Sequence, residues 1–251
     1  MSPDDHQAFL RALVERVAGD PRVVGVVALG SSSDPAAVDA WSDHDLFLVV
    51  APGAQEAFRN DLSWLAPGKV LHAFRETAHG VTAILEGGHL VELAVFDPEE
   101  LAVARVSRYR VLFDRGGIAG RMEAVARASE GARGESGADD AWLTGMFLSG
   151  VLVGGGRARR GERLAGRAAL AGAARRLMVL IARHVPGAGG LDPFDPHRRF
   201  ERAYPSIGAE IDQALSRGGP EGALLLLAIA ERATSLIPRD AAAAIRARLT
   251  A

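Results

Sequence analysis

The chain has 251 residues, of which 48% are hydrophobic and 24% charged, a composition typical of a globular protein that can bury a sizeable core. It contains no cysteine, which excludes disulfides and thiolate metal sites. The N-terminal segment has acidic residues where a signal peptide needs basic and apolar ones, and no apolar run reaches the roughly 20 residues of a membrane helix. We therefore expect a cytoplasmic protein with no membrane partner.

The formal net charge is only −2, but the charge is unevenly distributed along the chain. Residues 1–100 contain 6 basic and 16 acidic residues, a balance of −10, whereas residues 101–251 contain 23 basic and 15 acidic residues, a balance of +8. Such asymmetry indicates two parts with different functions. An arginine-rich, solvated helical surface explains the second part equally well.

The first half of the chain reads mainly as strands. Phe9, Leu13 and Val17 recur every four residues and predict a helix over 4–19, which Asp20-Pro21 ends. Apolar runs at 22–29 and 44–50 predict buried strands, and a helix is expected at about 54–65. Further strand-like segments, separated by glycine or turn residues, follow at 69–77, 80–88, 89–97 and 110–114.

Beyond these strands, the sequence has helical periodicity. Helices are predicted at 119–130, 138–153, 161–185, 207–217, 220–236 and 239–250, with a linker over 126–140 and a helix break at Gly154-Gly155-Gly156. Strands followed by helices predict an α+β fold. We expect an N-terminal domain at 1–117, with a small mixed β-sheet flanked by helices, and an all-helical C-terminal domain at 118–251.

Three acidic residues stand out in the predicted sheet. Asp43 and Asp45 open a strand and, because side chains alternate along a strand, lie on the same face. Glu92 lies inside the apolar strand "HLVELAVF", where an unpaired, buried glutamate is rare. Isolated buried charges cost several kcal/mol, so a cation between these carboxylates would explain them, and Mg²⁺ prefers such oxygen ligands.

The turn after the first strand supplies a second feature. Gly30 permits close backbone approach, and Ser31 offers N–H and hydroxyl donors. A helix that starts here would favour a phosphate at its N-terminus. Gly154-Gly155-Gly156 is not a P-loop, because it lacks a preceding strand and the Lys-Ser/Thr pair.

The combination of an apolar strand, Gly30-Ser31, a loop, Asp43-x-Asp45 and Glu92 in a later strand resembles the DNA polymerase beta-like nucleotidyltransferase superfamily. The segments "LVELAVF", "DPEEL" and "VLFDRGG" are similar to those of small bacterial antibiotic nucleotidyltransferases of the kanamycin and lincosamide types. The motifs cover residues 23–117. The same resemblance implies that the helical C-terminal domain completes the substrate and nucleotide cleft.

The resemblance implies an enzyme that transfers a nucleoside monophosphate, usually AMP from ATP, to a hydroxyl of a small molecule by a two-metal mechanism. Asp43 and Asp45 would hold Mg²⁺, Glu92 would bind a second ion or activate the acceptor hydroxyl, and Gly30 and Ser31 would bind the triphosphate. A nucleoside triphosphate and a hydroxylated acceptor, possibly an antibiotic, are the implied partners. Nucleic acid is not expected, and a homodimer is left open.

The chain departs from the family pattern at one point, since "SSSDPAAVDAW" after Gly30 has no Arg or Lys. The missing positive charge could instead come from Arg160, Arg163 and Arg167, which share one face of a predicted helix, although a solvated face is the favoured interpretation of these three. The basic helical part also favours a neutral or anionic acceptor over a polycationic aminoglycoside.

Several alternatives remain open at this stage. Glu92 could form a buried ion pair with Arg75, and Trp41 and Trp142 read as packing residues rather than stacking platforms. A glycosyltransferase also uses Asp-x-Asp, but it needs a longer nucleotide-binding region before that motif. The main functional alternative is a catalytically silent homologue that binds a nucleotide or a partner protein, an alternative that only the missing basic residue supports.

Overall fold

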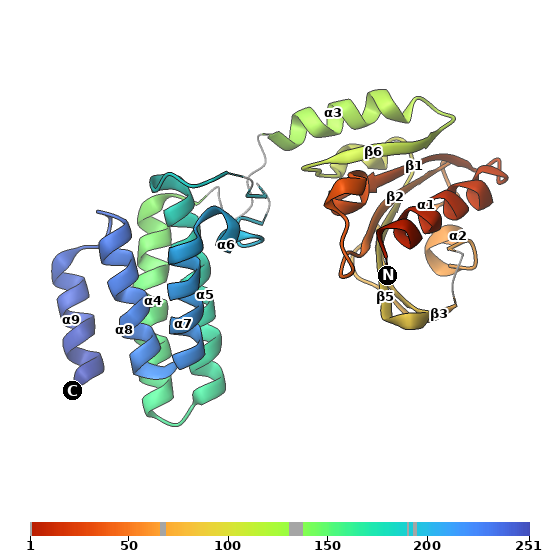
Figure 1. The fold of residues 1–251 in the computed structure, drawn as a ribbon. Coiled ribbons are helices and arrows are strands. Elements are labelled where there is room, and N and C mark those ends of the chain that lie inside the picture. The colour runs from red at the N-terminus through yellow and green to blue at the C-terminus, as the bar shows by residue number, and fades with distance from the viewer. Residues whose placement is uncertain (1, 66–68, 131–137, 190, 193–194) are drawn as a thin grey trace. The chain divides into compact units, whose positions relative to one another are not determined.

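The computed structural model describes residues 2–65, 69–130, 138–189, 191–192 and 195–251 (Figure 1). The chain forms two compact units, residues 1–132 and 133–251. The first contains a mixed sheet and its helices, and the second is helical, which confirms the predicted α+β class. The first unit extends past the predicted boundary at residue 117, because α3 (Ile118–Glu130) packs on it. Residues 131–137 of the predicted linker lie outside the described residues.

Helix α1 (Pro3–Ala18) begins with strong local signals. The Ser2 side chain accepts a hydrogen bond from the Asp5 N–H, and the Asp5 side chain accepts one from the Ser2 N–H, so the two residues form a capping box. Pro3 follows the cap at a position where a proline fits a helix. The buried side chains recur at helical spacing and face the sheet: His6, Phe9, Leu10, Leu13 and Val17.

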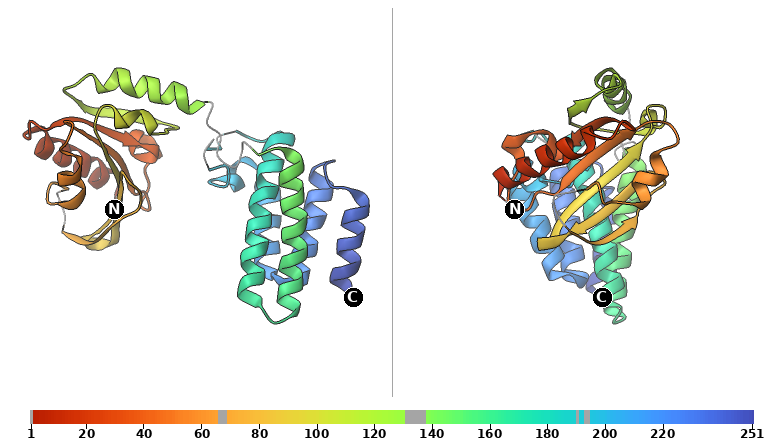
Figure 2. Two further views of the ribbon diagram at one scale, coloured as in Figure 1. Left: turned by 180° about the vertical axis from the view of Figure 1, so that it is seen from behind. Right: turned by 90° about the vertical axis from the view of Figure 1, so that its right-hand side faces the viewer.

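The six strands of the sheet run in the order β3-β4-β5-β2-β1-β6 (Figure 2). Strands β2 and β5 pair in parallel, and the other neighbours are antiparallel, so the sheet is mixed as predicted. The strand bounds lie close to the apolar runs in the sequence: β1 (Val23–Leu29), β2 (His44–Val50), β3 (Val70–Arg75), β4 (Gly80–Leu85), β5 (His89–Phe96) and β6 (Tyr109–Asp114).

The two faces of the sheet are covered differently. Helix α1 and α2 (Gln55–Asn60) pack on one face, and α3 with the short 3₁₀ turn η4 (Glu100–Val103) packs on the other. Helix α2 is shorter than the helix predicted at 54–65. The reason is local, because the Asp61 carboxylate accepts the Ser63 N–H at 2.9 Å and turns the chain.

The second unit consists of helices around one apolar core, which includes Phe147, Leu170, Leu177 and Phe200. Helix α5 packs along α4, and α8 contacts α4, α7 and α9. The helices in this unit are α4 (Asp140–Arg159), α5 (Arg163–His184), α6 (Phe200–Ala203), α7 (Pro205–Arg217), α8 (Gly219–Ala233) and α9 (Arg239–Thr250).

The predicted helix break at Gly154-Gly155-Gly156 is wrong, because α4 continues through all three residues. Two of the three glycines, Gly154 and Gly155, allow close packing instead. A Cβ on Gly154 would lie 2.7 Å from the Leu170 side chain and 3.1 Å from the Gly166 carbonyl oxygen in α5. Glycine therefore allows α4 and α5 to approach more closely than any other residue would permit.

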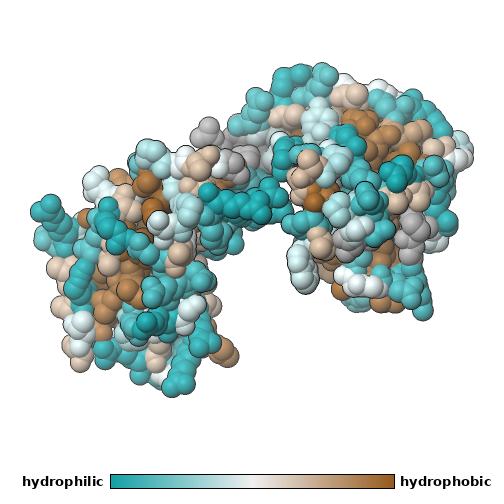
Figure 3. All heavy atoms as spheres, viewed as in Figure 1, coloured by the Kyte–Doolittle hydropathy of each residue, from teal (hydrophilic) through white to brown (hydrophobic). Residues whose placement is uncertain are grey.

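In the view of Figure 3, hydrophilic residues cover much of the surface of each unit, and apolar residues show between them. A few large apolar side chains are exposed, and the most exposed is Trp41 at 94%. Trp142 is also exposed, at 46%, so the prediction that both tryptophans are packing residues is wrong for Trp41 and holds only in part for Trp142. Among the described residues, no helix combines the length and apolar character that a membrane span requires.

The glycines of α4 give a paired stability test. We expect Gly154→Ala to lower the free energy of unfolding by about 1–3 kcal/mol, because the added methyl group overpacks the contact with Leu170. Gly145 in the same helix has no atom within 4 Å of a built Cβ, so Gly145→Ala should raise stability by up to about 1 kcal/mol through helix propensity. Urea unfolding measures both values, and equal effects at the two positions would contradict the packing argument.

Candidate metal centre

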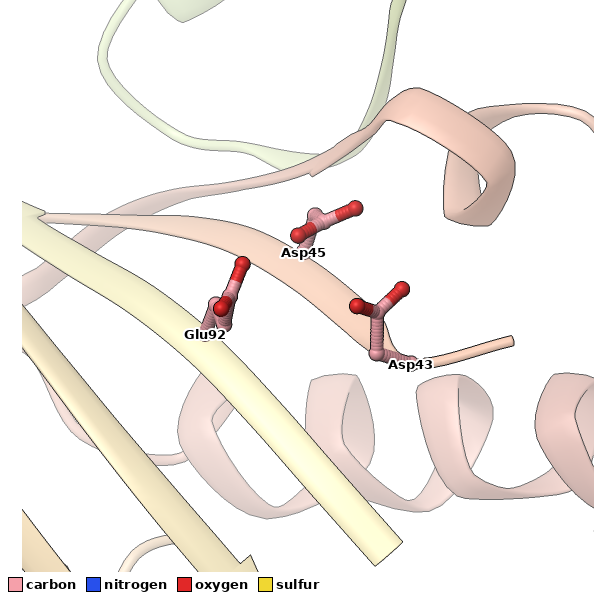
Figure 4. Close-up of side chains that lie close together, drawn as sticks. All are labelled: Asp43, Asp45 and Glu92. Carbon is pink, nitrogen blue, oxygen red and sulfur yellow. The ribbon is translucent and has the colours of Figure 1, made fainter. Parts of the chain in front are cut away.

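The structure brings the three predicted acids together on one face of the sheet. In the parallel register of β2 and β5, Asp45 lies beside Glu92. Asp43 directly precedes β2 and, two residues from Asp45, points to the same side (Figure 4). One carboxylate oxygen from each residue lies within 4.8 Å of the others. Such a set of hard oxygen donors fits Mg²⁺ or a similar divalent cation.

The burial of these acids differs from the sequence-based expectation. Asp43 and Asp45 are partly buried, but Glu92 is exposed rather than buried within the sheet. Within the described part of the first unit, α3 and η4 cover this face around Val27, Phe47 and Phe96 and leave Glu92 exposed. Mutual repulsion between the three carboxylates, rather than burial, therefore favours a bound cation. Two like charges about 4 Å apart repel by about 1 kcal/mol in bulk water and by more near a protein surface.

The alternative partner for Glu92 is excluded by geometry. The Arg75 guanidinium binds both carboxylate oxygens of Glu56 at 2.8 Å and the Ala78 carbonyl oxygen at 2.6 Å. The strand register places Arg75 opposite Val81, whose side chain belongs to the core on the α1 face, whereas Glu92 lies on the other face. The structure therefore excludes the alternative of an ion pair between Glu92 and Arg75.

The Gly-Ser turn after β1 packs directly against the carboxylates. Gly30–Ser33 forms a single 3₁₀ turn, η1, rather than the start of a longer helix, so a helix N-terminus for phosphate is absent from this part of the described chain. Gly30 has a positive φ of 50°, and a Cβ built on it would lie 2.9 Å from an Asp45 carboxylate oxygen. Ser31 is buried, and its Oγ has no hydrogen-bond partner among the described residues.

Two arginines near this turn, Arg108 and Arg110, come from the residue before β6 and from β6 itself. The Arg108 carbonyl oxygen accepts the Gly30 N–H at 3.2 Å, and the Arg108 guanidinium lies 3.9 Å from the Asp34 carboxylate. Arg110 donates to the Ser32 carbonyl oxygen at 3.4 Å and to the Gln7 side-chain oxygen at 3.1 Å. Sequence reasoning missed both arginines, because they lie almost 80 residues beyond the turn and only the pairing of β1 with β6 brings them near.

The helical arginines proposed for the same role do not form the predicted group. Arg160 follows the end of α4 and pairs with Glu162 at 2.9 Å, whereas Arg163 and Arg167 belong to α5. The three therefore do not share one helix face.

A chain of three histidines lies on the opposite face of the sheet, behind the acids. His44, between the two aspartates, is fully buried, and its ring stacks on His6 and Phe9 with centroid distances of 3.6 and 4.3 Å. This confirms the prediction that His44 is a packing residue. Its Nδ1 lies 2.5 Å from His89 Nε2, and its Nε2 lies 3.0 Å from the His6 carbonyl oxygen.

The carbonyl acceptors define the protonation of this chain. Because a carbonyl oxygen can only accept, His44 must carry its proton on Nε2, which leaves its Nδ1 to accept a hydrogen bond from His89 Nε2–H. Neutral rings agree with the direction of the pKa shifts. Burial lowers the pKa of His44 to about 3 and also lowers the pKa values of His6 and His89.

Gly30 provides a test of how closely the turn must approach Asp45. We expect Gly30→Ala to weaken Mn²⁺ binding at least tenfold, because the new methyl group meets the Asp45 carboxylate. Gly87→Ala is the matched control, since Gly87 also has a positive φ, of 82°, but nothing lies within 4 Å of a Cβ there. Both variants carry backbone strain of about 1–2 kcal/mol, so equal losses of Mn²⁺ affinity would show that strain alone is responsible.

Because burial keeps these histidines neutral in the folded protein, we expect the protein to lose stability in acid. Between pH 6.5 and about pH 3, the unfolded chain binds a proton at His44 that the folded chain does not bind. The free energy of unfolding therefore falls as the pH falls through this window, by up to about 1.4 kcal/mol per pH unit from His44. Urea unfolding at several pH values should show a shallower dependence for His44→Gln than for the wild type. Parallel curves would contradict a buried neutral His44.

Comparison with known proteins gives limited matches. No protein-family model matches the chain, and no curated protein does. Among solved structures, it is similar to an aminoglycoside 6-adenyltransferase from Bacillus subtilis, with 12% identity, coverage of 98% of this chain and 91% of that chain, and a TM-score of 0.31. It is also similar to a nucleotidyltransferase-like protein from Exiguobacterium sibiricum 255-15, with 15% identity, coverage of 90% and 74%, and a TM-score of 0.35.

Proposed function

We propose that the chain is a Mg²⁺-dependent nucleotidyltransferase that moves a nucleoside monophosphate, with AMP from ATP as the first choice, to a hydroxyl group of a small molecule. One observation carries the proposal, namely the convergence of Asp43, Asp45 and Glu92 beside a Gly-Ser turn. Three acids alone are common on protein surfaces. Their position against a turn that only glycine permits is the feature that favours a bound triphosphate.

Each residue has a role that its position supports. Asp43 and Asp45 hold divalent cations, which supply charge neutralisation for the triphosphate and for the attacking and leaving oxygens. Gly30 leaves room beside Asp45, so that the turn offers backbone N–H groups close to the phosphates. Ser31 stays a candidate for phosphate binding through its backbone, because its hydroxyl is buried. Arg108, half exposed beside the turn, supplies positive charge where the family pattern has a basic residue.

Glu92 fits the acceptor side of the reaction. It is the most exposed of the three acids, so an incoming hydroxyl group can reach it. Its carboxylate accepts the hydroxyl proton while the acceptor oxygen bonds to the α-phosphorus. The bond between the α- and β-phosphates breaks, and pyrophosphate leaves with the bonding electron pair. The role of residues 118–251 as a domain that completes the substrate cleft stays a prediction.

Titration calorimetry tests the nucleotide site directly. We expect ATP to bind the wild type only with Mg²⁺ present, and Asp45→Asn to weaken this binding by at least the 10–100-fold typical of supporting residues at metal sites. Glu86→Gln is the matched control, because Glu86 is an exposed acid outside the cluster. Failure of the folded wild type to bind ATP with Mg²⁺ would contradict the proposal.

Pyrophosphate release separates an enzyme from the silent homologue. With ATP, Mg²⁺ and a panel of hydroxylated acceptors, the wild type should release pyrophosphate, and Glu92→Gln should release it at least a hundredfold more slowly, because general-base catalysis contributes about 10²–10⁴-fold. Metal-dependent ATP binding without pyrophosphate release from any acceptor would favour the silent homologue.

A further inference from the structure

The backbone of Asp43 and Asp45 lies just beyond the end of the described ladder between β1 and β2. In an extended chain, the carbonyl of one residue and the N–H of the residue two positions later point to the same edge. For the Asp43 carbonyl and the Asp45 N–H, this edge is the one that the Ser32 side chain contacts. The ladder between β1 and β2 ends at the pair of Ala28 and Leu46, so it does not reach these groups.

The Ser32 hydroxyl makes the two hydrogen bonds that a neighbouring strand would make at this position. Ser32 is fully buried, and its Oγ donates to the Asp43 carbonyl oxygen at 3.2 Å. The same oxygen accepts the Asp45 N–H at 3.3 Å. One side chain thus satisfies both backbone groups, as a neighbouring strand would. The second serine of the Gly30-Ser31-Ser32 turn therefore supports the aspartates rather than facing a ligand.

His6 adds a second donor from α1. Its Nε2 lies 3.0 Å from the Asp43 carbonyl oxygen and 3.3 Å from Ser32 Oγ. Since the carbonyl can only accept, His6 carries its proton on Nε2. The ring is almost fully buried and stacked on His44, which leaves it little freedom to move. Helix α1 and the Gly-Ser turn therefore meet at one carbonyl group, that of Asp43.

We propose that His6 and Ser32 are positioning residues, which hold the backbone at 43–45 so that the Asp43 and Asp45 carboxylates converge with Glu92. This inference rests on the proposed metal site and deepens it. Both residues contact the backbone of the aspartates rather than their carboxylates. Each acts through the Asp43 carbonyl group, and residues in such supporting positions commonly change metal affinity by 10–100-fold when they are replaced.

Mn²⁺ affinity, measured by electron paramagnetic resonance on the full chain, tests the inference. We expect His6→Leu and Ser32→Ala each to weaken Mn²⁺ binding about 10–100-fold. His6→Gln keeps an N–H donor near the position of Nε2 and should recover most of the affinity. Val17→Ala is the structural control, because Val17 is buried at the opposite end of the same helix from His6, and its replacement should lower stability without changing the contacts of the Asp43 carbonyl.

The outcomes separate this inference from the proposed function. Wild-type Mn²⁺ affinity in folded His6→Leu and Ser32→Ala, together with a loss in Asp45→Asn, would overturn the positioning role alone. Wild-type affinity in Asp45→Asn would overturn the metal site and this inference with it. If affinity fell in Val17→Ala as much as in His6→Leu, or if His6→Gln recovered nothing, the effect would follow general stability and the positioning role would be wrong. If His6→Leu does not fold, the Mn²⁺ affinity of Ser32→Ala tests the positioning role by the same criteria.

Discussion

The parallel pairing of β2 with β5 is the constraint on which the candidate site depends. It joins two strands that are separated in the chain by a helix and a hairpin strand pair, and it fixes Asp45 beside Glu92. A shift of one residue would move either acid to the opposite face, where the side chains of α1 fill the core. The apolar residues of both strands hold the register, because Leu46, Leu48, Val91 and Val95 must all face α1. The register of β2 and β5 therefore determines both the hydrophobic core on one face of the sheet and the acid cluster on the other.

Much of this fold could be predicted from local patterns. The bounds of β2 coincide with the predicted run at 44–50, and α1 follows the spacing of Phe9, Leu13 and Val17. The common face of Asp43 and Asp45 also follows from strand geometry alone. The convergence of Glu92 with them was a hypothesis about which strands are neighbours, and the structure shows the pairing. The metal-binding role of the three acids stays a prediction.

The predictions that failed depend on three-dimensional neighbours. Glu92 was expected to be buried because the residues around it are apolar, but whether a sheet face is covered depends on helices elsewhere in the chain. A Gly-Gly-Gly run indicates a helix break by propensity. However, α4 continues through it, because Gly154 packs closely on α5 and Gly155 packs closely on α9. His6 and Ser32 carry no recognisable signal, since a histidine near the start of an amphipathic helix and a serine in a turn are ordinary in sequence.

The Ser32 hydroxyl makes hydrogen bonds that a strand would otherwise make, and this has an evolutionary consequence. It ties positions 6, 32 and 43 together, although they lie on three different elements. If the three acids are under selection, His6 and Ser32 should be under selection as well. In related chains that keep all three acids, residues 6 and 32 should vary little or change together. In chains that have lost the acids, the same positions should drift towards ordinary apolar core residues, because two buried polar groups would no longer be under selection for a site.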